Sequence, residues 1–422
     1  MEKTSRVSGF HKFSIKERLK FVQDFCGLKE EDLKLLTKEA ALNMETADRM
    51  VENVIGTLQI PLGIGMNFLI NNKEYLIPMA IEEPSVVAAA SNAARLVRSG
   101  GGFFVSNTGP IMIAQIQVVN VRDAQAGRMA LFERKKEILE IANAQDPILI
   151  GLGGGARDLE IRVLDSPLGK MVVLHLVVDT RDAMGANAVN TMAEKLAPHI
   201  EEWTGGRVYL RILSNLADKR IVRARGKVTK DALGGEDIVD GIVWAYTFAS
   251  VDPYRAATHN KGIMNGVIAV VNATGNDTRA IEAGAHSYAA RTGHYTSLTT
   301  WEKDADGNLV GTLEMPMAVG LVGGATKVNP ISQLAIKILG VKTAVELGEI
   351  IGAVGLAQNL AAIRILATEG VQRGHMSLHA KNIAAMAGAV GNLIDEVAKR
   401  LAAEGKVRVD RAKEILEELK KK

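Results

Sequence analysis

The stretch from residue 110 to 214 constrains the fold more than any other part of this chain, because its apolar pattern changes between period two and helical period in a fixed order. A strand pattern (MIAQIQVVNV) precedes a helix pattern (QAGRMALFERKKEILEIANAQ), two strands (DLEIRVLD and KMVVLHLVVD), a second helix (AMGANAVNTMAEKLAPHIEEW) and a last strand (RVYLRIL). The turn sequence Ser166-Pro167-Leu168-Gly169 joins the two middle strands. The order β-α-β-β-α-β is that of a ferredoxin-like unit, which predicts an independently folding domain here.

This unit is predicted to be inserted into a larger domain, because the sequence on both sides is helical and rich in glycine. Helices are expected over residues 14–55, where Ser14 and Glu17 form a capping box. A hairpin turning at Asn71-Asn72 follows them. The composition changes again after Gly374, where a small helical appendage with a charged face is expected. We therefore predict an α+β protein in which residues 1–109 and 216–373 form a large helix-rich domain, 110–215 the insertion and 374–422 a small C-terminal domain.

Composition excludes several classes of protein. Of the 422 residues, 47% are hydrophobic and 23% charged, which is typical of globular chains and not of disordered ones. The net charge of +3 gives no reason to expect a nucleic-acid or membrane-surface partner. The one cysteine, Cys26, cannot form an intrachain disulfide. With no secretory signal and no uninterrupted apolar run of membrane-spanning length, the chain is expected to be a soluble, cytoplasmic protein.

Two glycine-containing segments are candidate nucleotide sites. Gly151 to Ala156 loosely fits the dinucleotide fingerprint, but a strand and not a helix follows it, so a glycine-rich loop is the better interpretation. In the segment from Asp182 to Asn190, Asp182 is expected to cap a helix whose first turn of Ala and Gly leaves backbone N–H groups open to an anion. A capped helix that packs tightly through small residues explains the same pattern.

Cations and acids occur in unusual surroundings further along the chain. Lys261 lies among Gly, Asn and His before an apolar run, where a lysine can stabilise an oxyanion, and Arg255 can bind a carboxylate through two hydrogen bonds. Both can equally be surface cations. Asp277 precedes a helix and is, by charge, a candidate partner of Lys261. Glu83 precedes Pro84 at another helix start, where an acid is either a dipole partner or a general acid.

Histidines add one further candidate. His175 lies in an apolar strand and is expected to be a packed core residue, whereas His375 follows the composition change and can protonate a leaving group. No Cys/His cluster suggests zinc, and neither a P-loop nor a nucleophile-elbow motif occurs.

Taken in order, five segments resemble the signatures of the 3-hydroxy-3-methylglutaryl-coenzyme A (HMG-CoA) reductase family. They are Glu82-Glu83-Pro84-Ser85, Asp182-Ala183-Met184-Gly185-Ala186-Asn187, Asp252 to Gly266, Ala273-Thr274-Gly275-Asn276-Asp277 and Gly374-His375-Met376. The likeness extends from Glu52-Asn53-Val54-Ile55-Gly56 to His379. Without a membrane anchor, the chain is similar to the soluble, class II, prokaryotic branch.

The resemblance implies that HMG-CoA is reduced to (R)-mevalonate and free coenzyme A by two hydrides from NAD(P)H, or the reverse, without a metal. The residues that match the family's catalytic positions are Glu83, Lys261, Asp277 and His375. By this resemblance Lys261 stabilises the substrate oxygen and Asp277 fixes the lysine. Glu83 supplies a proton in the second reduction, and His375 protonates the departing thiolate.

Binding residues follow from the same resemblance. The HMG group is expected to meet Ser85, Asn215 and Arg255. The nucleotide is expected to meet Asp182, Met184, Gly185, Ala186, Asn187 and Asn190, with Asn265 beside the catalytic lysine. Asp146 matches an acid near the adenosine ribose, and its carboxylate favours NADH because it repels a 2′-phosphate; a simple helix-end acid before Pro147 is the alternative.

The family resemblance also implies a homodimer with active sites between subunits, helix-rich substrate-binding and ferredoxin-like nucleotide-binding domains, and a C-terminal flap that delivers the histidine. Two alternatives stay open: catabolic oxidation of mevalonate by the same chemistry, and a CoA- or nucleotide-binding homologue that has lost turnover.

Overall fold

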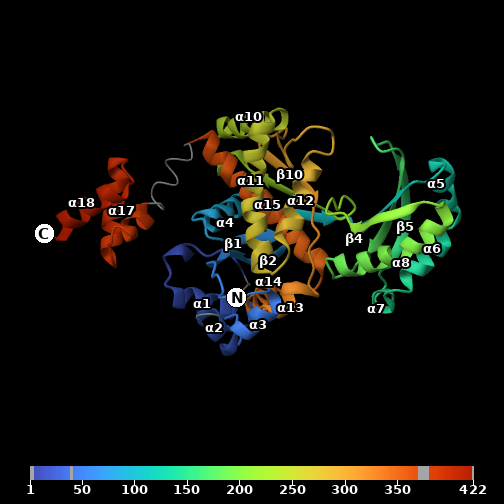
Figure 1. The fold of residues 1–422 in the computed structure, drawn as a ribbon. Coiled ribbons are helices and arrows are strands. Elements are labelled where there is room, and N and C mark those ends of the chain that lie inside the picture. Colours follow the sequence, from blue (N-terminus) through green and yellow to red (C-terminus); the bar gives the residue numbers. More distant parts are fainter. Residues whose placement is uncertain (1–3, 39–40, 369–379, 421–422) are drawn as a thin grey trace.

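The computed structural model describes residues 4–38, 41–368 and 380–420. Figure 1 shows a central body, with a four-stranded sheet and its helices on one side and the C-terminal helices α17 and α18 on the other. The mixed α+β class predicted from the sequence is confirmed.

Three helices begin the described chain: α1 (Ile15–Cys26), α2 (Glu30–Thr37) and α3 (Met44–Met50). The apolar faces of α1 and α2 pack on α14 and the β1–β2 hairpin of the central body. The predicted capping box is present, because the Ser14 side chain accepts from the Glu17 backbone and Glu17 accepts from the Ser14 backbone. The third helix ends before its predicted limit, where Asn53 takes a positive φ of 59° that no α-helix contains.

The predicted hairpin consists of β1 (Leu62–Ile70) and β2 (Lys73–Ala80). Asn71 and Asn72 both have positive φ, 47° and 63°, as a tight two-residue turn requires. After it come α4 (Val86–Val97) and the short 3₁₀ helix η2 (Arg98–Gly100).

A six-stranded sheet with the order β2-β1-β3-β8-β10-β9 forms the frame of the central body. Its other strands are β3 (Phe103–Asn107), β8 (Ile221–Val228), β9 (Thr299–Lys303) and β10 (Leu309–Pro316). Strands β3 and β8 pair antiparallel, with Phe103 opposite Gly226 and Asn107 opposite Val222. The residues between these neighbouring strands therefore leave the central body and return to it at one place.

Those intervening residues form the four-stranded sheet, which has the strand order β5-β6-β4-β7 of a ferredoxin-like unit. Its strands are β4 (Ile111–Val119), β5 (Gly155–Leu164), β6 (Met171–Asp179) and β7 (Arg207–Leu213), and its helices are α5 (Ala124–Glu133), α6 (Lys135–Asn143), α7 (Pro147–Gly151) and α8 (Ala186–Thr204). The first helix was predicted as one continuous segment; it is interrupted at Arg134, and α7 is an additional turn.

The prediction that His175 is a core residue is wrong. Leu174 and Leu176 face the helices, so His175 points to the opposite face of the sheet, where its Nε2 lies 2.9 Å from Gln115 Nε2 and 2.8 Å from Arg162 Nη2.

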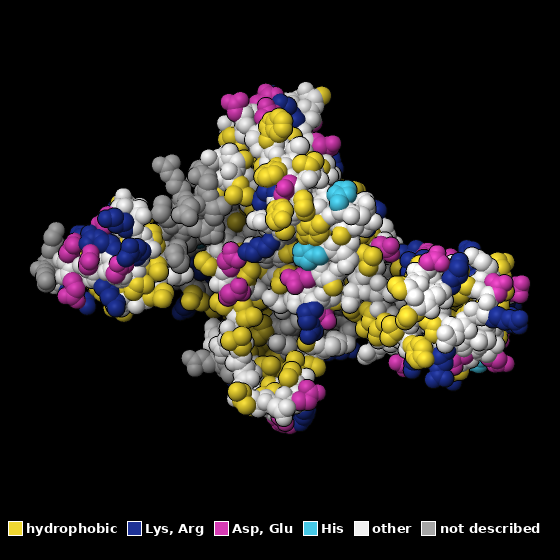
Figure 2. Space-filling model, turned by 45° about the horizontal axis from the view of Figure 1, so that its top comes forward, with side chains coloured by type: hydrophobic (Ala, Val, Ile, Leu, Met, Phe, Trp, Pro, Cys, Tyr) yellow, Lys and Arg dark blue, Asp and Glu magenta, His cyan; other side chains and the backbone are white. Residues whose placement is uncertain are grey.

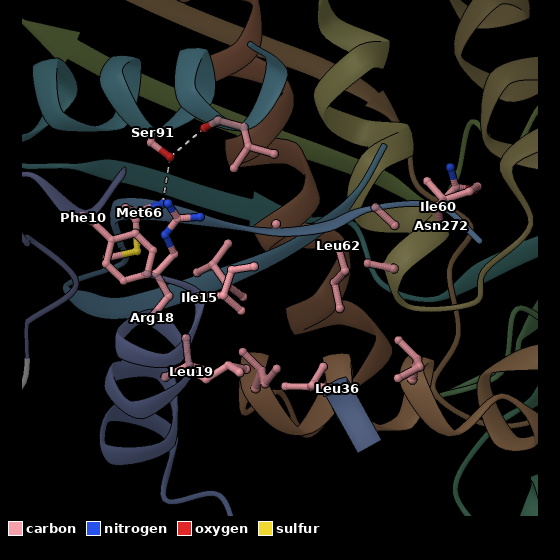
Figure 3. Close-up of a pocket in the computed structure, with 18 of the residues that line it drawn as sticks. Phe10, Ile15, Arg18, Leu19, Leu36, Ile60, Leu62, Met66, Ser91 and Asn272 are labelled. Carbon is pink, nitrogen blue, oxygen red and sulfur yellow. Dashed lines mark hydrogen bonds between the residues drawn. The ribbon is translucent and has the colours of Figure 1, made fainter. Parts of the chain in front are cut away.

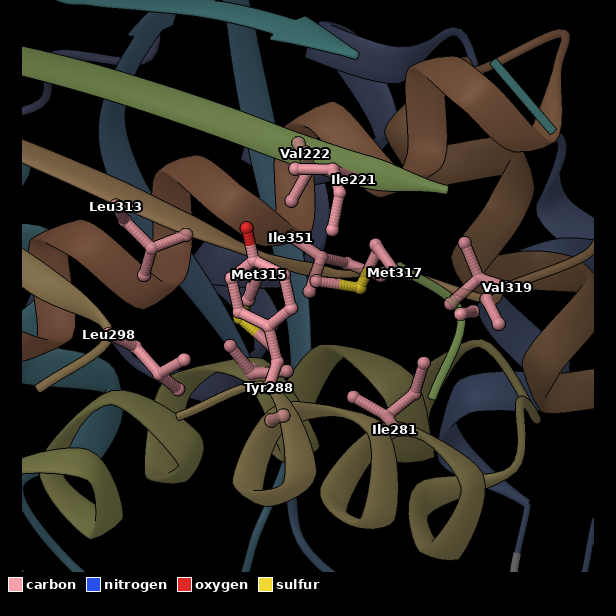
Figure 4. Packing of buried hydrophobic residues seen from close by; sticks show 14 of the residues in the cluster. Ile221, Val222, Ile281, Tyr288, Leu298, Leu313, Met315, Met317, Val319 and Ile351 are labelled. Atoms are coloured by element: carbon pink, nitrogen blue, oxygen red, sulfur yellow. The ribbon is translucent and has the colours of Figure 1, made fainter. Parts of the chain in front are cut away.

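Helices cover the six-stranded sheet. They are α9 (Lys230–Leu233), α10 (Glu236–Val251), α11 (Pro253–Ala273), α12 (Thr278–Ala289), α13 (Gly324–Val328), α14 (Pro330–Leu339) and α15 (Ala344–Ala367). In Figure 4, Ile281 and Tyr288 of α12 pack against Met315 and Leu313 of β10, with Ile351 of α15 in the same cluster. Helices α11 and α15 approach closely at Gly266 and Gly355.

By length and composition α15 could cross a membrane, although Glu346, Glu349, Gln358 and Asn359 interrupt its apolar residues, so it holds no uninterrupted apolar run of membrane-spanning length. Its most apolar window is 72% buried inside the protein, as in the core helix of a globular fold.

The described C-terminal part has its own small core. Helices α17 (Asn392–Glu404) and α18 (Val409–Lys420) bury Val397, Leu401 and Ile415 in a cluster separate from the main one.

Candidate functional site

The start of α4 presents two of the predicted site residues. Ser85 is the N-cap residue, yet its φ of 79° and ψ of −23° place it in the left-handed region, and its hydroxyl caps nothing. Its Oγ is buried and has no hydrogen-bond partner among the described residues. A strained backbone with an unpaired buried hydroxyl is the geometry expected of a ligand-binding serine.

Lys261 of α11 reaches the same place from the other side. Its Nζ donates to Glu83 Oε2 at 3.0 Å, which joins two predicted catalytic residues that lie 178 positions apart in the sequence. The lysine side chain is 59% exposed and the glutamate 36%, so both are accessible to a substrate.

Arg255 lies six residues before Lys261 on α11, whose first turn is fixed by Asp252 Oδ1 accepting from the Arg255 backbone N–H at 2.7 Å. Burial lowers the pKa of Arg255. No carboxylate pairs with its guanidinium in the part of the chain that the structure describes. A half-buried cation without an internal counter-charge can take a substrate carboxylate.

Asp277 caps α12, where its Oδ1 accepts from the backbone N–H groups of Arg279 and Ala280. The hydrogen bond from the Arg279 side chain is the largest of the effects that lower the pKa of Asp277. Asp277 therefore pairs with Arg279, and Lys261 pairs with Glu83. The expected ion pair between Asp277 and Lys261 is not formed among these described side chains. The Oδ1 of the neighbouring Asn276 accepts a hydrogen bond from Gly320 N at 2.7 Å, which fixes this loop to the segment that follows β10.

The remaining predicted residues of the substrate side lie on the same body. Asn265 is half-buried on α11, one turn beyond Lys261. Asn215 follows β7 and is exposed, and its backbone carbonyl lies so close to α12 that a Cβ on Gly284 would come within 2.7 Å of it.

The prediction that Asp182 caps α8 is wrong. The N-cap is Gly185, with φ 102°, and no side chain caps the helix. Asp182 Oδ1 instead accepts from Ala344 N at 2.7 Å, at the start of α15. The first-turn N–H groups of α8, beginning at Ala186, therefore have no side-chain acceptor, which is the arrangement of an anion site.

Arg220, which sequence reasoning missed, holds the loop before α8 in place. Its Nη1 donates to Thr180 Oγ1 and Ala183 O at 3.1 Å and to Met184 O at 3.3 Å, and its Nη2 donates to Val319 O. Burial lowers the pKa of Arg220 to about 10, so the guanidinium is still charged at neutral pH. Nothing in the sequence around Arg220 marks it, because its partners are mostly backbone carbonyls.

Other predicted nucleotide residues have structural partners as well. Asn190 Oδ1 accepts from Leu213 N at 2.9 Å, which ties α8 to β7, and Asn187 is exposed on the first turn. Asp146 caps α7, with Oδ1 accepting from Leu149 N at 2.9 Å. The glycine-rich segment after α7 forms a turn at Gly153, whose carbonyl accepts from Arg157 and Arg181.

A cavity of about 1370 Å³ lies elsewhere. It separates the N-terminal helices from β1 and α4, and Figure 3 shows Phe10, Ile15 and Leu19 facing Leu62 across it. Glu83, Lys261 and Asp277 do not line it, so the candidate catalytic residues lie at the α4–α11 contact and not in this cavity.

No group of three metal-binding side chains occurs among the residues described. His375 lies outside the described residues.

Comparisons with known proteins identify relatives over nearly the whole chain. The family model described as hydroxymethylglutaryl-coenzyme A reductase matches residues 14–380. A 3-hydroxy-3-methylglutaryl-coenzyme A reductase of Archaeoglobus fulgidus is 59% identical over 99% of this chain and 95% of its own. A probable one of Borreliella burgdorferi is 38% identical over 79% and 77%. The class II reductase of Streptococcus pneumoniae, in a structure with bound NADPH, is 40% identical with a TM-score of 0.83 over 86% of this chain and 99% of that one.

Proposed function

The chain belongs to the hydroxymethylglutaryl-coenzyme A reductase family, and from that premise we propose that the contact of Lys261 with Glu83 is its catalytic centre. Membership makes the protein an oxidoreductase of the mevalonate pathway, which interconverts HMG-CoA with mevalonate and CoA using a nicotinamide cofactor. The single observation that carries the proposal is the 3.0 Å hydrogen bond between these two side chains from α11 and α4.

The nicotinamide, when bound, supplies the hydride for each of the two reductions. Lys261 donates a hydrogen bond to the substrate carbonyl oxygen, where negative charge grows as the thioester becomes a hemithioacetal. Asp277 lies at the start of α12, and we assign it the role of holding the lysine once the ligand is present. Glu83 is in contact with the same ammonium and provides the proton that converts the oxygen of mevaldehyde to an alcohol. We assign protonation of the leaving CoA thiolate to His375.

Three groups are assigned to the HMG moiety. Arg255 binds its carboxylate, because this guanidinium lacks an internal counter-charge among the described residues. The unpaired Ser85 Oγ supplies a further hydrogen bond. Asn215, the third group, projects from the segment between β7 and β8.

We assign residues 110–215 to nucleotide binding, with the pyrophosphate at the uncapped start of α8 and Asn265 beside the nicotinamide. Asp146 has one carboxylate oxygen engaged with Leu149 and the second without a described partner. Its charge would repel a 2′-phosphate, which favours NADH; the pneumococcal relative binds NADPH, so cofactor preference must be measured.

We further propose a cytoplasmic homodimer. The support is the amount of apolar surface: Trp244, Phe248 and Val251 of α10 are 73%, 56% and 76% exposed, and Ile55 and Leu58 are almost fully exposed. Figure 2 shows hydrophobic side chains gathered over this part of the central body. Residues 1–109 and 216–373 then form the substrate and dimerisation domain, and residues 374–422 the flap.

The test is absorbance of the reduced nicotinamide when purified protein meets HMG-CoA with NADH or with NADPH. Two equivalents oxidised per HMG-CoA support the proposal, and the cofactor with the larger kcat/KM decides the role of Asp146. No oxidation with either cofactor, and no reduction of NAD(P)⁺ with mevalonate and CoA, would overturn it and favour a binding protein without turnover. Growth on mevalonate of a strain that depends on this gene would favour the catabolic direction.

A further inference from the structure

Helix α11 carries a fully buried histidine between its two proposed substrate cations. His259 is 1% exposed and lies one turn after Arg255 and two residues before Lys261. Its Nε2 lies 2.7 Å from Thr299 Oγ1 of β9 and 3.2 Å from Asn359 Nδ2 of α15. The helix is thus joined through polar atoms to a strand on one side and to a helix on the other.

Asn359 is the common partner of this buried network. Its Oδ1 accepts from Thr299 Oγ1 at 3.0 Å and from Trp301 Nε1 at 2.8 Å, and it is itself inaccessible to solvent. Trp301 is itself buried, 1% exposed, and its ring packs directly on Gly311, where an added Cβ would come within 2.2 Å of the indole. The position of His259 is therefore fixed by groups that are fixed themselves.

The next residue provides a second attachment. Asn260 Oδ1 accepts from Leu298 N at 3.0 Å, and its Nδ2 donates to Thr296 O at 2.9 Å. Consecutive helical residues point about 100° apart, so two such anchors fix the rotation of α11 as well as its axial position. A slip of one residue would move Lys261 by about 1.5 Å along the axis and turn it away from Glu83.

The anchor is also electrically neutral. Burial, and then the nearby Arg255 cation, lower the pKa of His259 to about 3. The groups that interact with the imidazole are Arg255 from its own helix and the uncharged Thr299 and Asn359 from β9 and α15. A carboxylate in this position would pair with Arg255, whereas a neutral imidazole leaves the guanidinium charge for the substrate.

We propose that His259 is a positioning residue: its buried, hydrogen-bonded side chain sets the placement of α11 and thereby of Arg255 and Lys261 on the HMG group. The proposal rests on the substrate roles assigned to those two cations. It distinguishes His259 from the histidine that protonates the thiolate, because His259 touches neither substrate nor cofactor.

The experiment compares His259→Leu, which removes both ring nitrogens, with His259→Gln, whose terminal amide reaches about as far as Nε2 and is uncharged. KM for HMG-CoA and KM for the nicotinamide are measured separately, together with the folded fraction from thermal melts. His286→Leu is the control, because His286 of α12 also bonds a hydroxyl, with Nδ1 2.8 Å from Tyr295 OH, but lies off α11.

We expect His259→Leu to raise the KM for HMG-CoA about tenfold or more, with the nicotinamide KM changed less than about twofold, and His259→Gln to recover most of the loss. The proposal would be overturned if His259→Leu left both KM values unchanged and lowered kcat only in proportion to the folded fraction. It would also be overturned if His259→Gln were as defective as His259→Leu. If the leucine variant fails to fold, Thr299→Val, which keeps shape and removes the hydroxyl, replaces it with the same expected direction. An inactive parent enzyme would contradict the proposed function instead.

Discussion

The four-stranded unit and the central body bury polar groups in different places. The former has an apolar core of Met112, Ile116, Leu174 and Met192 between a regular sheet and its helices, and its buried polar residues Asp179 and Thr180 lie at the end of β6. The latter buries polar residues in the middle of its core: His259 and Asn260 of α11, the helix that carries Lys261, and Thr299 and Asn359 packed against it. An apolar sandwich is sufficient to position the uncapped start of α8, where we propose that the nucleotide binds, whereas aligning side chains from α4 and α11 needs directional contacts inside the core.

The strongest way to break this comparison is Lys261→Ala. We expect kcat/KM to fall about 10³-fold for both HMG-CoA and mevaldehyde, because the developing oxyanion loses its cation, while binding of the nicotinamide to the four-stranded unit is unchanged. Steady-state rates and cofactor fluorescence titration measure the two effects. Lys20→Ala, which removes an exposed cation paired with Asp24, is the control and should retain full activity. If Lys261→Ala weakened nicotinamide binding as much as it lowered kcat/KM, cofactor binding by the four-stranded unit would depend on the side chain of Lys261 in the central body.

Arg220→Met tests the connection between the units. We expect the KM for the nicotinamide to rise about tenfold or more, because the loop before α8 loses hydrogen bonds that charged donors make at about 1.5–3 kcal/mol each. Arg223→Met is the matched control on β8, since Arg223 is half exposed and pairs with Glu314. A KM change confined to HMG-CoA would contradict the role given to Arg220.

Two glycine substitutions on α11 sharpen the account of the central body. A Cβ at Gly266 would lie 2.8 Å from Gln358 Cβ, whereas at Gly262 the nearest atom, Ala362 Cβ, is 3.4 Å away. We expect Gly266→Ala to lower the free energy of unfolding by about 1–3 kcal/mol and Gly262→Ala to raise it by up to about 1 kcal/mol through helix propensity. Urea titrations measure both, and similar values for the two would show that α11 and α15 can move apart.

Acid melts test the buried imidazole of the central body directly. The pKa of His259 is about 3 in the folded state against an ordinary 6.5, so the unfolded state binds the extra proton. This residue's contribution to stability is complete above pH 6.5 and falls by about 1.4 kcal/mol per pH unit as the pH drops toward 3. We expect His259→Gln to flatten the loss of Tm over that range, compared with the parent and with His286→Leu. Parallel curves would mean that His259 is protonated in the fold.

Local signals predicted the elements well where neighbouring residues decide the outcome. Ser14 with Glu17 and Asn71-Asn72 specify a helix start and a turn through their own side chains and backbone. The period of residues 110–214 predicted the ferredoxin-like order because one face of each element is buried. Boundaries set by tertiary contacts, such as the break at Arg134, carried no comparable signal.

The candidate site was predicted less completely, because its contacts join distant segments. Asp182 was a sound cap candidate by sequence, but its partner is Ala344, 162 residues away. The pairing of Lys261 with Glu83 and the role of Arg220 depend in the same way on how β3, β8 and α11 come together. The motifs were sufficient to select candidate residues for the site, whereas the contacts that each side chain makes could be identified only from the folded structure.

Helix α15 has a consequence for synthesis of the chain. It is 24 residues long, with a mean hydropathy of 1.7 over its most apolar window, and it packs against α4, α10, α11 and strands β3, β8 and β10, all of which precede it in the sequence. On a translating ribosome, every surface that receives α15 has therefore been made before the helix emerges, so its exposed lifetime is short. A circular permutation that placed residues 344–367 first would reverse this order and offer a membrane-length apolar helix to the targeting and aggregation machinery of the cell.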